Sequence, residues 1–467
     1  MNKRFTKFIL TIAFFCLWIC SLCACAAPKT QSPRLPLLAS ETPLAVATQV
    51  KPSPTVASTK VPTQIVIHNE NLEIFEEVWS TIFLTFFDLD FGGVDWYAVH
   101  ARYKPLIIAA ADDESLYRLL NKMLWELNVS HTGVGPAEMW PSVEPVVFED
   151  GEIGIDVRLL DDRAVITRVE AASPAEESGL RAGFILQSIE GVSIEQIIAD
   201  AQGELAPPYN DQGRIDLLTR RLLSLIYGDP GTCVNLAYLD EKDKSYQECI
   251  ERVPRPREAV LIGGTLPPSY LEFESGRLAS GIGYIRFNTF HPDLISDMVE
   301  AIDALKDAPG IIIDLRGNPG GYPDAAEELA AQFVVDQVSF GSFKTRSGTI
   351  ERMVTGKNVY PGPLVILIDA LSYSASEYFS SGLQEIGRAV IIGERSPGGV
   401  TAMDVKILQN GALLGCPVAQ LITSDGKVLE GYGVIPDITV TLERDQLLKG
   451  IDAQLQAAIE TILENVR

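Results

Sequence analysis

The sequence predicts a multidomain protein of mixed α+β and α/β class, with three folded segments behind an N-terminal leader and a linker. The chain has 467 residues, which is enough for two or three separate hydrophobic cores. Its apolar pattern also changes twice, from helical spacing to short alternating strands and then to buried strands alternating with helices. These changes place the folded segments at 67–147, 148–255 and 256–467.

Composition and charge exclude some classes of partner. A hydrophobic content of 46% and a charged content of 21% are ordinary for a globular protein. The 38 basic and 62 acidic residues give a net charge of −24, and no long basic patch offsets it. We therefore expect neither nucleic acid nor an anionic membrane surface as a partner.

Residues 1–25 have the features of a secretory leader. Lys3, Arg4 and Lys7 precede the apolar run FILTIAFFCLWICSL, which is short for a membrane span. The following LCAC resembles the lipobox of bacterial lipoproteins, which implies that Cys25 becomes the lipid-modified N-terminus. An uncleaved anchor helix is the alternative. Both predictions place the bulk of the chain on the extracytoplasmic face of a bacterial cell envelope, and the first anchors it to the membrane through lipid.

Residues 26–66 are rich in Pro, Thr, Ser and Ala and lack the apolar periodicity of a core. We expect them to form an extended, disordered tether between the lipid and the folded part.

Four of the seven cysteines lie in the leader. Cys233 and Cys249 flank VNLAYLDEKDKSYQE, which is typical of a hairpin turning at DEKD. Their placement about that turn allows a cross-strand disulfide in an oxidising compartment, and two unpaired small hydrophobic residues are the equal alternative. Cys416 has no evident partner.

Residues 67–147 are predicted to be helical. Two sets of apolar residues follow the i, i+3, i+4, i+7 spacing, and core packing explains both sets. The first is Phe75, Val78, Trp79, Ile82, Phe83 and Phe86, and the second is Leu116, Leu119, Leu120, Met123, Leu124 and Leu127. The second helix runs directly into NVSHTGVG at 128–135.

Residues 148–255 change to short strands with turns between them. The stretch SPAEESGLRAGFILQSIEG resembles the PDZ domains of secreted proteases. That resemblance implies a domain that binds the C-terminus of a peptide as an added strand, with backbone amides around Ile153, Gly154 and Ile155 holding the carboxylate. Residues 192–230 are expected to form a helical insertion.

Residues 256–467 alternate strand and helix, the pattern of an α/β domain, and one of the helices is expected at 324–335. One buried strand leads through Asp314 into the turn NPGG, where Gly320 and Gly321 let backbone N–H groups point at one anionic atom. A plain tight turn is the alternative. The next strand, PLVILIDA, ends in the turn that holds Ser374. In a parallel sheet the two turns can lie side by side at one edge.

Ser374 has two interpretations. The spacing from Ser374 to Glu377 fits a capping box at the start of a helix, and on this stretch alone the cap is the simpler interpretation. Ser374 is also a candidate nucleophile.

Four motifs, DLRGNPGG, SYSASE, GRAVIIGERSPGG and EGYGVIPDI, resemble those of the C-terminal processing peptidases, which include tail-specific proteases and the core of tricorn protease. The resemblance covers nearly everything after residue 70. It implies a crotonase-like α/β catalytic domain that hydrolyses polypeptides. In the family pattern Ser-Ala-Ser-Ala-Ser-Glu the middle serine is the nucleophile, which implies Ser374 here. The amide of Ala375 and that of Gly320 or Gly321 would form the oxyanion hole.

The chain departs from the tail-specific branch at the base. That branch carries a lysine in Gly-Lys-Gly after the next strand, and Gly399 stands in its place here. The tricorn-type branch uses a Ser-His-Ser-Glu tetrad, and this resemblance implies His131 as the base with Ser130 and Glu430 orienting it. A helix-end histidine bonded to a carbonyl group is the alternative for His131. Lys406 remains a candidate base that fits the spacing of neither branch.

The leading hypothesis is thus an extracytoplasmic, lipid-anchored serine endopeptidase that forms an acyl-enzyme, with polypeptides as substrates. A catalytically inactive, PDZ-containing, peptide-binding lipoprotein is the main alternative. An acyl-transfer enzyme of crotonase-like shape is a third hypothesis, which the leader and the PDZ-like segment disfavour. No metal motif such as H-E-x-x-H occurs, and no cofactor is expected. Glu430 is expected to raise the pKa of His131 by favouring the imidazolium.

Overall fold

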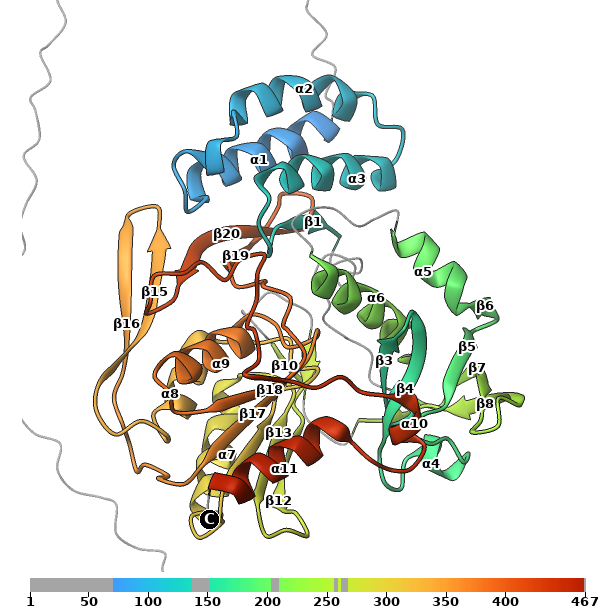
Figure 1. Ribbon diagram of the computed structural model, residues 1–467. Coiled ribbons are helices and arrows are strands. Elements are labelled where there is room, and N and C mark those ends of the chain that lie inside the picture. Colours follow the sequence, from blue (N-terminus) through green and yellow to red (C-terminus); the bar gives the residue numbers. More distant parts are fainter. Residues whose placement is uncertain (1–69, 137–150, 203–209, 256–258, 262–267, 466–467) are drawn as a thin grey trace, which may run out of the picture. The chain divides into compact units, whose positions relative to one another are not determined.

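Figure 1 presents the computed structural model, which describes residues 70–136, 151–202, 210–255, 259–261 and 268–465. The predicted leader with Cys25, the predicted linker and His68 lie outside these ranges. Among the helices in the described ranges, none combines the length and the apolar character that crossing a bilayer requires.

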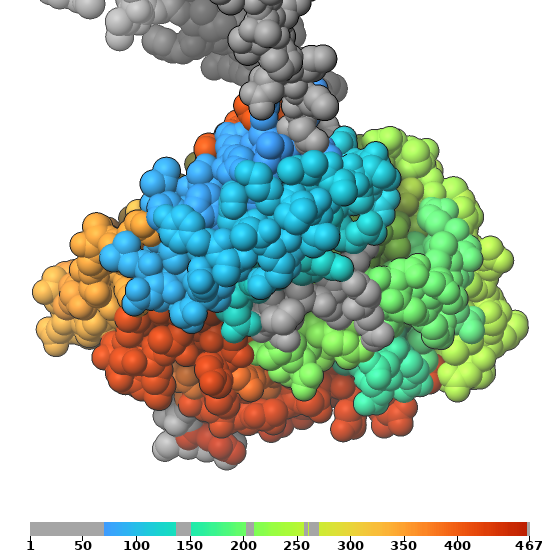
Figure 2. All heavy atoms as spheres, turned by 90° about the horizontal axis from the view of Figure 1, so that it is seen from above, coloured from blue at the N-terminus to red at the C-terminus, as the bar shows by residue number. Residues whose placement is uncertain are grey.

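Helices form the first part of the described chain, as the periodicity predicts. They are α1 (Glu70–Thr85), α2 (Trp96–Ile108) and α3 (Asp113–Leu124), with the 3-10 turns η1 (Phe91–Gly93) and η2 (Trp125–Leu127). Phe75, Val78 and Leu120 are fully buried between them. The same apolar cluster includes Leu414 and Cys416 of β20 (Leu413–Ile422), so the helices pack on that strand. Figure 2 shows the blue atoms of the helices in contact with the red-orange atoms of the later strands.

An antiparallel sheet next to these helices was not predicted. It contains β1 (Gly133–Gly135), β15 (Val338–Thr345), β16 (Gly348–Val354), β19 (Ala402–Ile407) and β20, in the order β1-β20-β15-β16 with β19 also paired to β20. Strand β1 pairs with β20 from Gly133↔Gly415 to Gly135↔Leu413. This pairing fixes the chain immediately after His131.

Residues 151–254 form a second antiparallel sheet, with the order β3-β4-β5-β7-β8. Its strands are β3 (Ile155–Leu160), β4 (Arg163–Val169), β5 (Ile185–Ile189), β7 (Cys233–Leu239) and β8 (Ser245–Glu251), with β6 (Val192–Ser193) paired to β5. The same segment holds the short helix α4 (Pro174–Glu177) and a separate two-stranded sheet of β2 (Gly151–Glu152) and β9 (Val253–Pro254). Helices α5 (Ile194–Gln202) and α6 (Asp211–Ile226) lie within residues 192–230, where helices are expected. A disulfide joins Cys233 to Cys249 across the predicted hairpin, with 5.5 Å between the Cα atoms.

The last segment alternates strand and helix, as predicted. Its sheet has the order β12-β13-β14-β17-β18-β21, parallel from β13 onwards. The strands are β12 (Phe273–Arg277), β13 (Gly283–Phe287), β14 (Ile311–Asp314), β17 (Leu364–Ile368), β18 (Val390–Gly393) and β21 (Ile438–Thr439), and β10 (Ala259–Leu261) pairs with β11 (Pro268–Tyr270) nearby. The helices are α7 (Pro292–Ala304), α8 (Pro323–Ala330), α9 (Ala375–Glu385), α10 (Arg444–Leu447) and α11 (Ala453–Asn465).

Helices cover both faces of this sheet. Met298 of α7, Leu329 of α8 and Phe379 of α9 share one buried cluster with alternate strand residues, and Ala458 and Ile462 of α11 pack on the other face. Fully buried strands therefore read as continuous apolar runs such as LVILI. Asp314 pairs with Leu367 at the carboxyl ends of β14 and β17, so the turns that follow these strands leave the same edge.

One helix is shorter than predicted. The expected helix 324–335 ends at Ala330. The carbonyl oxygens of Ala331 and Gln332 accept hydrogen bonds from the N–H groups of Lys357 and Tyr360 instead of continuing the helix. Contacts to a distant segment, which local periodicity does not reveal, end α8 early.

Candidate active site

Ser374 occupies the turn that joins β17 to α9. Its φ is +56° and its ψ is −115°, a sparsely populated conformation for a residue with a side chain. The predicted capping arrangement is present, because the Glu377 carboxylate accepts the N–H of Ser374 at 3.0 Å. An ordinary N-cap has extended dihedrals, however. A strained strand-to-helix turn is typical of an exposed nucleophile, so the cap does not account for Ser374 by itself.

The NPGG turn lies against Ser374, as the parallel sheet predicts. A Cβ atom on Gly320 would lie 2.7 Å from both Cβ of Ser374 and the amide nitrogen of Ala375. Buried Asn318 joins the two turns, since its carbonyl oxygen accepts the N–H of Tyr373 and the hydroxyl of Ser376, each at 3.0 Å. Asn318 Oδ1 also accepts the N–H of Gly320 at 2.8 Å.

Ser130, His131 and Glu430 form a connected group, although 300 positions separate the first from the last. The Ser130 hydroxyl lies 2.8 Å from Nδ1 of His131 and donates to Oε2 of Glu430 at 3.1 Å. The N–H of Ser130 donates to Oε1 of Glu430 at 2.5 Å. His131 has a φ of +57°, so the backbone turns sharply just before β1. The predicted association of these three residues is thus present in the fold.

Two buried carboxylates hold the loop that follows β18. Glu377 accepts the N–H groups of Gly398 at 2.6 Å and Gly399 at 2.9 Å, while Glu430 accepts those of Val400 and Thr401, each at 3.0 Å. The N–H groups of residues 398–401 thus donate in two pairs. The first pair binds Glu377, next to Ser374, and the second pair binds Glu430, next to Ser130. Burial and the nearby Glu430 charge raise the pKa of Glu377 to about 8, against the lowering effect of its hydrogen-bond donors.

The two halves meet at Tyr373, the residue before Ser374. Its ring stacks on the imidazole of His131, with 5.0 Å between the ring centres and 27° between the planes. Among the hydrogen bonds of the described residues, none joins His131 to Ser374 directly. Such bonds are often long in unliganded sites and shorten when substrate binds.

The pKa of His131 moves opposite to the sequence expectation. Burial lowers it to about 4, because removal from water disfavours the imidazolium. The expectation was wrong because Glu430 binds Ser130 and not the imidazole itself. His131 is consequently neutral at neutral pH, the form that a base requires.

The other candidate bases lie elsewhere. Lys406 donates to Oγ1 of Thr81 at 2.8 Å and pairs with Glu77 at 3.4 Å, so its ammonium group is bound to α1. His100 pairs with Glu76, and His291 caps α7. No group of three or more His, Cys, Asp or Glu side chains in the described ranges is arranged to hold a metal ion.

The predicted peptide-binding loop precedes β3. The carbonyl oxygen of Gly154 accepts the N–H of Glu170, and that of Ile153 accepts the N–H of Ala175. The side chains of Ile153 and Ile155 are buried, so only backbone groups of this loop are candidates for binding a carboxylate. Gly154 has a φ of +79°, and a Cβ atom there would overlap the Ser173 side chain.

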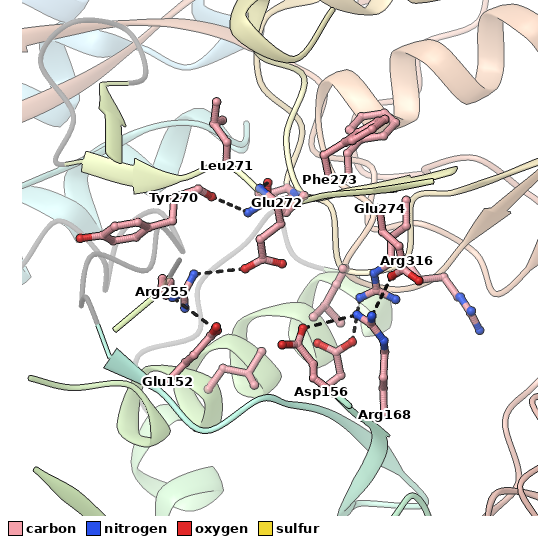
Figure 3. A pocket seen from close by; sticks show the side chains of 18 of the residues that line it. Glu152, Asp156, Arg168, Arg255, Tyr270, Leu271, Glu272, Phe273, Glu274 and Arg316 are labelled. Carbon is pink, nitrogen blue, oxygen red and sulfur yellow. Dashed lines mark hydrogen bonds and ion pairs between the residues drawn. The ribbon is translucent and has the colours of Figure 1, made fainter. Parts of the chain in front are cut away.

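A pocket of about 410 Å³ lies between the 151–254 sheet and the catalytic sheet (Figure 3). Ion pairs cross it from one sheet to the other, including Asp156–Arg286 at 2.7 Å and Arg168–Glu274 at 2.8 Å. Arg255 pairs more loosely with Glu152 and Glu272, at 3.5 and 3.4 Å. Ser374, His131 and Glu430 are not among the residues that line this pocket.

A buried ion pair connects β3 to the active-site turns. Arg158 Nε donates to Oδ2 of Asp369 at 2.7 Å. Oδ1 of Asp369 accepts the N–H groups of Gly317 at 3.0 Å and Leu371 at 2.9 Å. One carboxylate therefore binds the 151–254 sheet, the NPGG turn and the nucleophile turn.

Sequence reasoning missed Tyr373, Asp369 and Arg158 as residues of this site. Asp369 carried a usable signal, since it follows a fully buried strand at the predicted edge. Arg158 and the ring contact of Tyr373 carried none, because both depend on segments far apart in the chain.

Known proteins resemble this chain over most of its length. Residues 281–440 match Peptidase family S41, and residues 67–125 match the Tricorn protease C1 domain. A carboxyl-terminal-processing protease of Synechocystis sp. is 24% identical over 411 residues, which cover 85% of this chain and 88% of that protein. A putative tricorn protease homolog of Streptomyces coelicolor is 25% identical over 405 residues, covering 84% of this chain and 32% of the homolog.

Solved structures show the same fold. The photosystem II D1 C-terminal processing protease aligns with a TM-score of 0.53 and 19% identity, over 85% of this chain and 98% of that one. Mature CPAF aligns with a TM-score of 0.58 and 14% identity, over 85% and 98% of the two chains. Over residues 281–440 the chain therefore matches peptidase family S41, and the relatives that align with most of its length are carboxyl-terminal processing peptidases, which are serine-type hydrolases.

Proposed function

We propose that this peptidase is a lipid-anchored, extracytoplasmic endopeptidase in which Ser374 is the nucleophile and His131 the base. The observation that carries the proposal is the chain of contacts from Glu430 through Ser130 to Nδ1 of His131. That chain orients an imidazole, which proton transfer requires and peptide binding does not.

The contacts define the tautomer of His131. An ionised carboxylate can only accept hydrogen bonds, so the Ser130 hydroxyl donates to Glu430. The same hydroxyl oxygen then accepts a hydrogen bond from the N–H at Nδ1 of His131. Nε2 is then left with a lone pair for the Ser374 proton. Ser130 and Glu430 act as positioning residues that also stabilise the imidazolium when it forms.

The reaction has two halves. Ser374 Oγ attacks the scissile carbonyl carbon while its proton passes to Nε2 of His131. Collapse of the tetrahedral intermediate breaks the C–N bond, and the imidazolium returns the proton to the leaving amine. Water then attacks the ester, giving its proton to His131, and Ser374 is regenerated with release of a carboxylic acid.

Backbone amides would stabilise the oxyanion. Ala375 and one of the two glycines, Gly320 or Gly321, are the candidate donors. Because the N–H of Gly320 already donates to Asn318, Gly321 is the better candidate. A strained Ser374 next to these amides needs little reorganisation in the transition state.

Covalent labelling tests this proposal. A fluorophosphonate probe should label the wild-type protein with a pseudo-first-order rate, and Ser374→Ala should remove the label. A wild-type protein that folds but is not labelled would support the alternative, a peptide-binding lipoprotein without catalytic activity. The missing His131–Ser374 hydrogen bond is the observation that favours that alternative.

We also propose that the 151–254 sheet is PDZ-like and binds the C-termini of polypeptide substrates. The support is the loop at Ile153, Gly154 and Ile155, whose backbone would hold the terminal carboxylate, and the direct contact of β3 with Asp369. Blocking the C-terminal carboxylate of a protein substrate as an amide should slow its cleavage, while short internal peptides are unaffected. Equal rates for the acid and the amide would contradict the proposal.

The location is proposed from the leader. The LCAC sequence and the short apolar run support lipid attachment at Cys25. Cys25→Ser should give an unprocessed or released protein, measured as a changed mass and a changed membrane fraction. Unchanged mass and partition would contradict lipid attachment.

A further inference from the structure

The ring of Tyr373 fills the space between Gly399 and the imidazole of His131. A Cβ atom at Gly399 would overlap Cζ, Cε2 and the hydroxyl oxygen of Tyr373, so only glycine fits there while the ring is in place. The same ring stacks on the imidazole of His131, with 5.0 Å between the ring centres. Tyr373 is 5% exposed and His131 9%, so both rings are nearly removed from water.

Neither backbone can move aside easily. The N–H of Tyr373 donates to the carbonyl oxygen of Asn318 at 3.0 Å, and the N–H of Gly399 donates to Glu377 at 2.9 Å. The position of the ring is therefore set by two buried turns.

We infer that Tyr373 is the positioning residue for the base: its ring fixes the plane of the His131 imidazole, excludes water from it, and closes position 399 to any side chain. The inference rests on the proposed function and goes beyond it. The bond from Ser130 to Nδ1 fixes one edge of the imidazole but leaves rotation about that bond. Packing against a flat ring removes this freedom and directs Nε2.

The contact also relates two departures from the tail-specific pattern. That pattern has alanine where this chain has Tyr373, and lysine where it has Gly399. The two positions touch in the fold. A lysine at position 399 would overlap the Tyr373 ring, so this fold cannot hold both side chains while the ring keeps its place.

The electrostatic surroundings of His131 contain few charges. Glu430 reaches it through Ser130, and Glu377 reaches the same loop from α9. The lowered pKa of His131 arises from burial. Removing a ring that covers the imidazole should thus admit water and raise that pKa.

The first test does not depend on catalysis. The His131 imidazole signal, assigned by its loss in His131→Ala, is titrated by NMR in the full chain. Its midpoint should lie near 4 in the wild type and move towards an ordinary ~6.5 in Tyr373→Ala. Tyr373→Phe, which keeps the ring, should restore the wild-type midpoint. An unchanged midpoint in folded Tyr373→Ala, or a Phe variant that behaves like Ala, would overturn the inference.

The second test uses position 399. Gly399→Ala should displace the ring and lower the rate of Ser374 labelling by roughly 10-fold or more, an effect of the size expected for a misplaced base. In the Tyr373→Ala background, Gly399→Ala should not lower the labelling rate any further, because removal of the ring has already opened the space. Additive losses of labelling rate in the double variant would contradict the inference that the Tyr373 ring occupies this space. If wild-type protein is not labelled at all, the proposed function fails, while the titration and the change in thermal stability of the same variants still decide the role of Tyr373.

Discussion

The segment around Ser374 is held by its own sheet, whereas the segment around His131 is held by residues from the far end of the chain. Ser374 and Gly320 leave adjacent parallel strands, and backbone contacts through Asn318 fix their turns. His131 follows a 3-10 turn and depends on the side chain of Glu430 for its place. The position of the proposed nucleophile therefore depends on local geometry, and that of the proposed base depends on tertiary contacts.

Because of this difference, the base could vary within one fold while the turn that holds Ser374 stays the same. A turn built from two parallel strands keeps the nucleophile and its oxyanion donors whatever supplies the base. A base that depends on tertiary contacts needs several side chains in place at once, here Ser130, Glu430 and Tyr373.

The largest expected effect is on the nucleophile half. Ser374→Ala should lower peptide cleavage by at least about 10⁴-fold, because no other group can form the acyl-enzyme. Ser380 on the same helix is a matched control: it is fully buried and its hydroxyl lacks a hydrogen-bond partner among the described residues. Ser380→Ala should retain wild-type cleavage. A large loss in both variants would mean that α9 tolerates no change and that the assay reports folding.

Substitutions around His131 should lower the rate less than loss of Ser374 does. Glu430→Gln keeps the shape but replaces an acceptor by an NH₂ group that faces the amides of Ser130, Val400 or Thr401. We expect kcat to fall by roughly 10²- to 10⁴-fold with little change in KM, since the imidazole loses its orientation. Steady-state kinetics on one peptide measures both. An increase in KM alone would assign Glu430 to substrate binding.

The contact between the 151–254 sheet and the nucleophile turn should affect stability more than chemistry. Arg158→Met leaves Asp369 buried without its partner, which should lower the free energy of unfolding by roughly 3–5 kcal/mol. Labelling should slow about 10-fold, because Asp369 also holds the amides of Gly317 and Leu371. Denaturant unfolding and labelling rates check the two effects. Asp369→Asn in the same chain should recover part of the lost stability, and failure to do so would argue against the ion pair.

Moderate changes of pH should have the smallest effect. His131 stays neutral until the pH approaches its folded pKa of about 4, and Glu377, whose pKa is about 8, is already protonated at pH 7. Labelling rates should therefore remain flat from pH 7 to pH 5 and fall below that with one protonation. Stability follows a different window. The unfolded chain binds the proton near ~6.5, so this contribution is present above that pH and decreases as the pH falls towards 4. A fall of activity centred at or above neutral pH would contradict His131 as the buried base.

Much of this architecture could be predicted, for identifiable reasons. The periodicity of α1 and α3 gave the helices, and the continuous apolar runs of β14 and β17 gave the parallel sheet and hence the meeting of Gly320 with Ser374. The pairing of β1 with β20 was not predicted, because antiparallel contacts between residues 133 and 415 leave no local pattern.

The electrostatics were the least predictable part. The pKa of His131 was expected to rise, and burial lowers it instead. Burial depends on everything packed around the imidazole, including Tyr373, and none of that is encoded near position 131. The motif identified Ser130 and Glu430 as partners but not the distance of the charge from the ring.

The most direct test of His131 as the base is the rate at which a fluorophosphonate probe labels Ser374. This rate is compared between His131→Ala and Lys406→Ala. Mass spectrometry locates the fluorophosphonate adduct, and the time course gives the rate. We predict that His131→Ala slows labelling of Ser374 by several orders of magnitude, because nucleophile and base act as a unit. Lys406→Ala should leave it unchanged, since that ammonium is bound to Thr81 and Glu77. Labelling of Ser374 that persists in His131→Ala and disappears in Lys406→Ala would contradict His131 as the base and assign that role to Lys406.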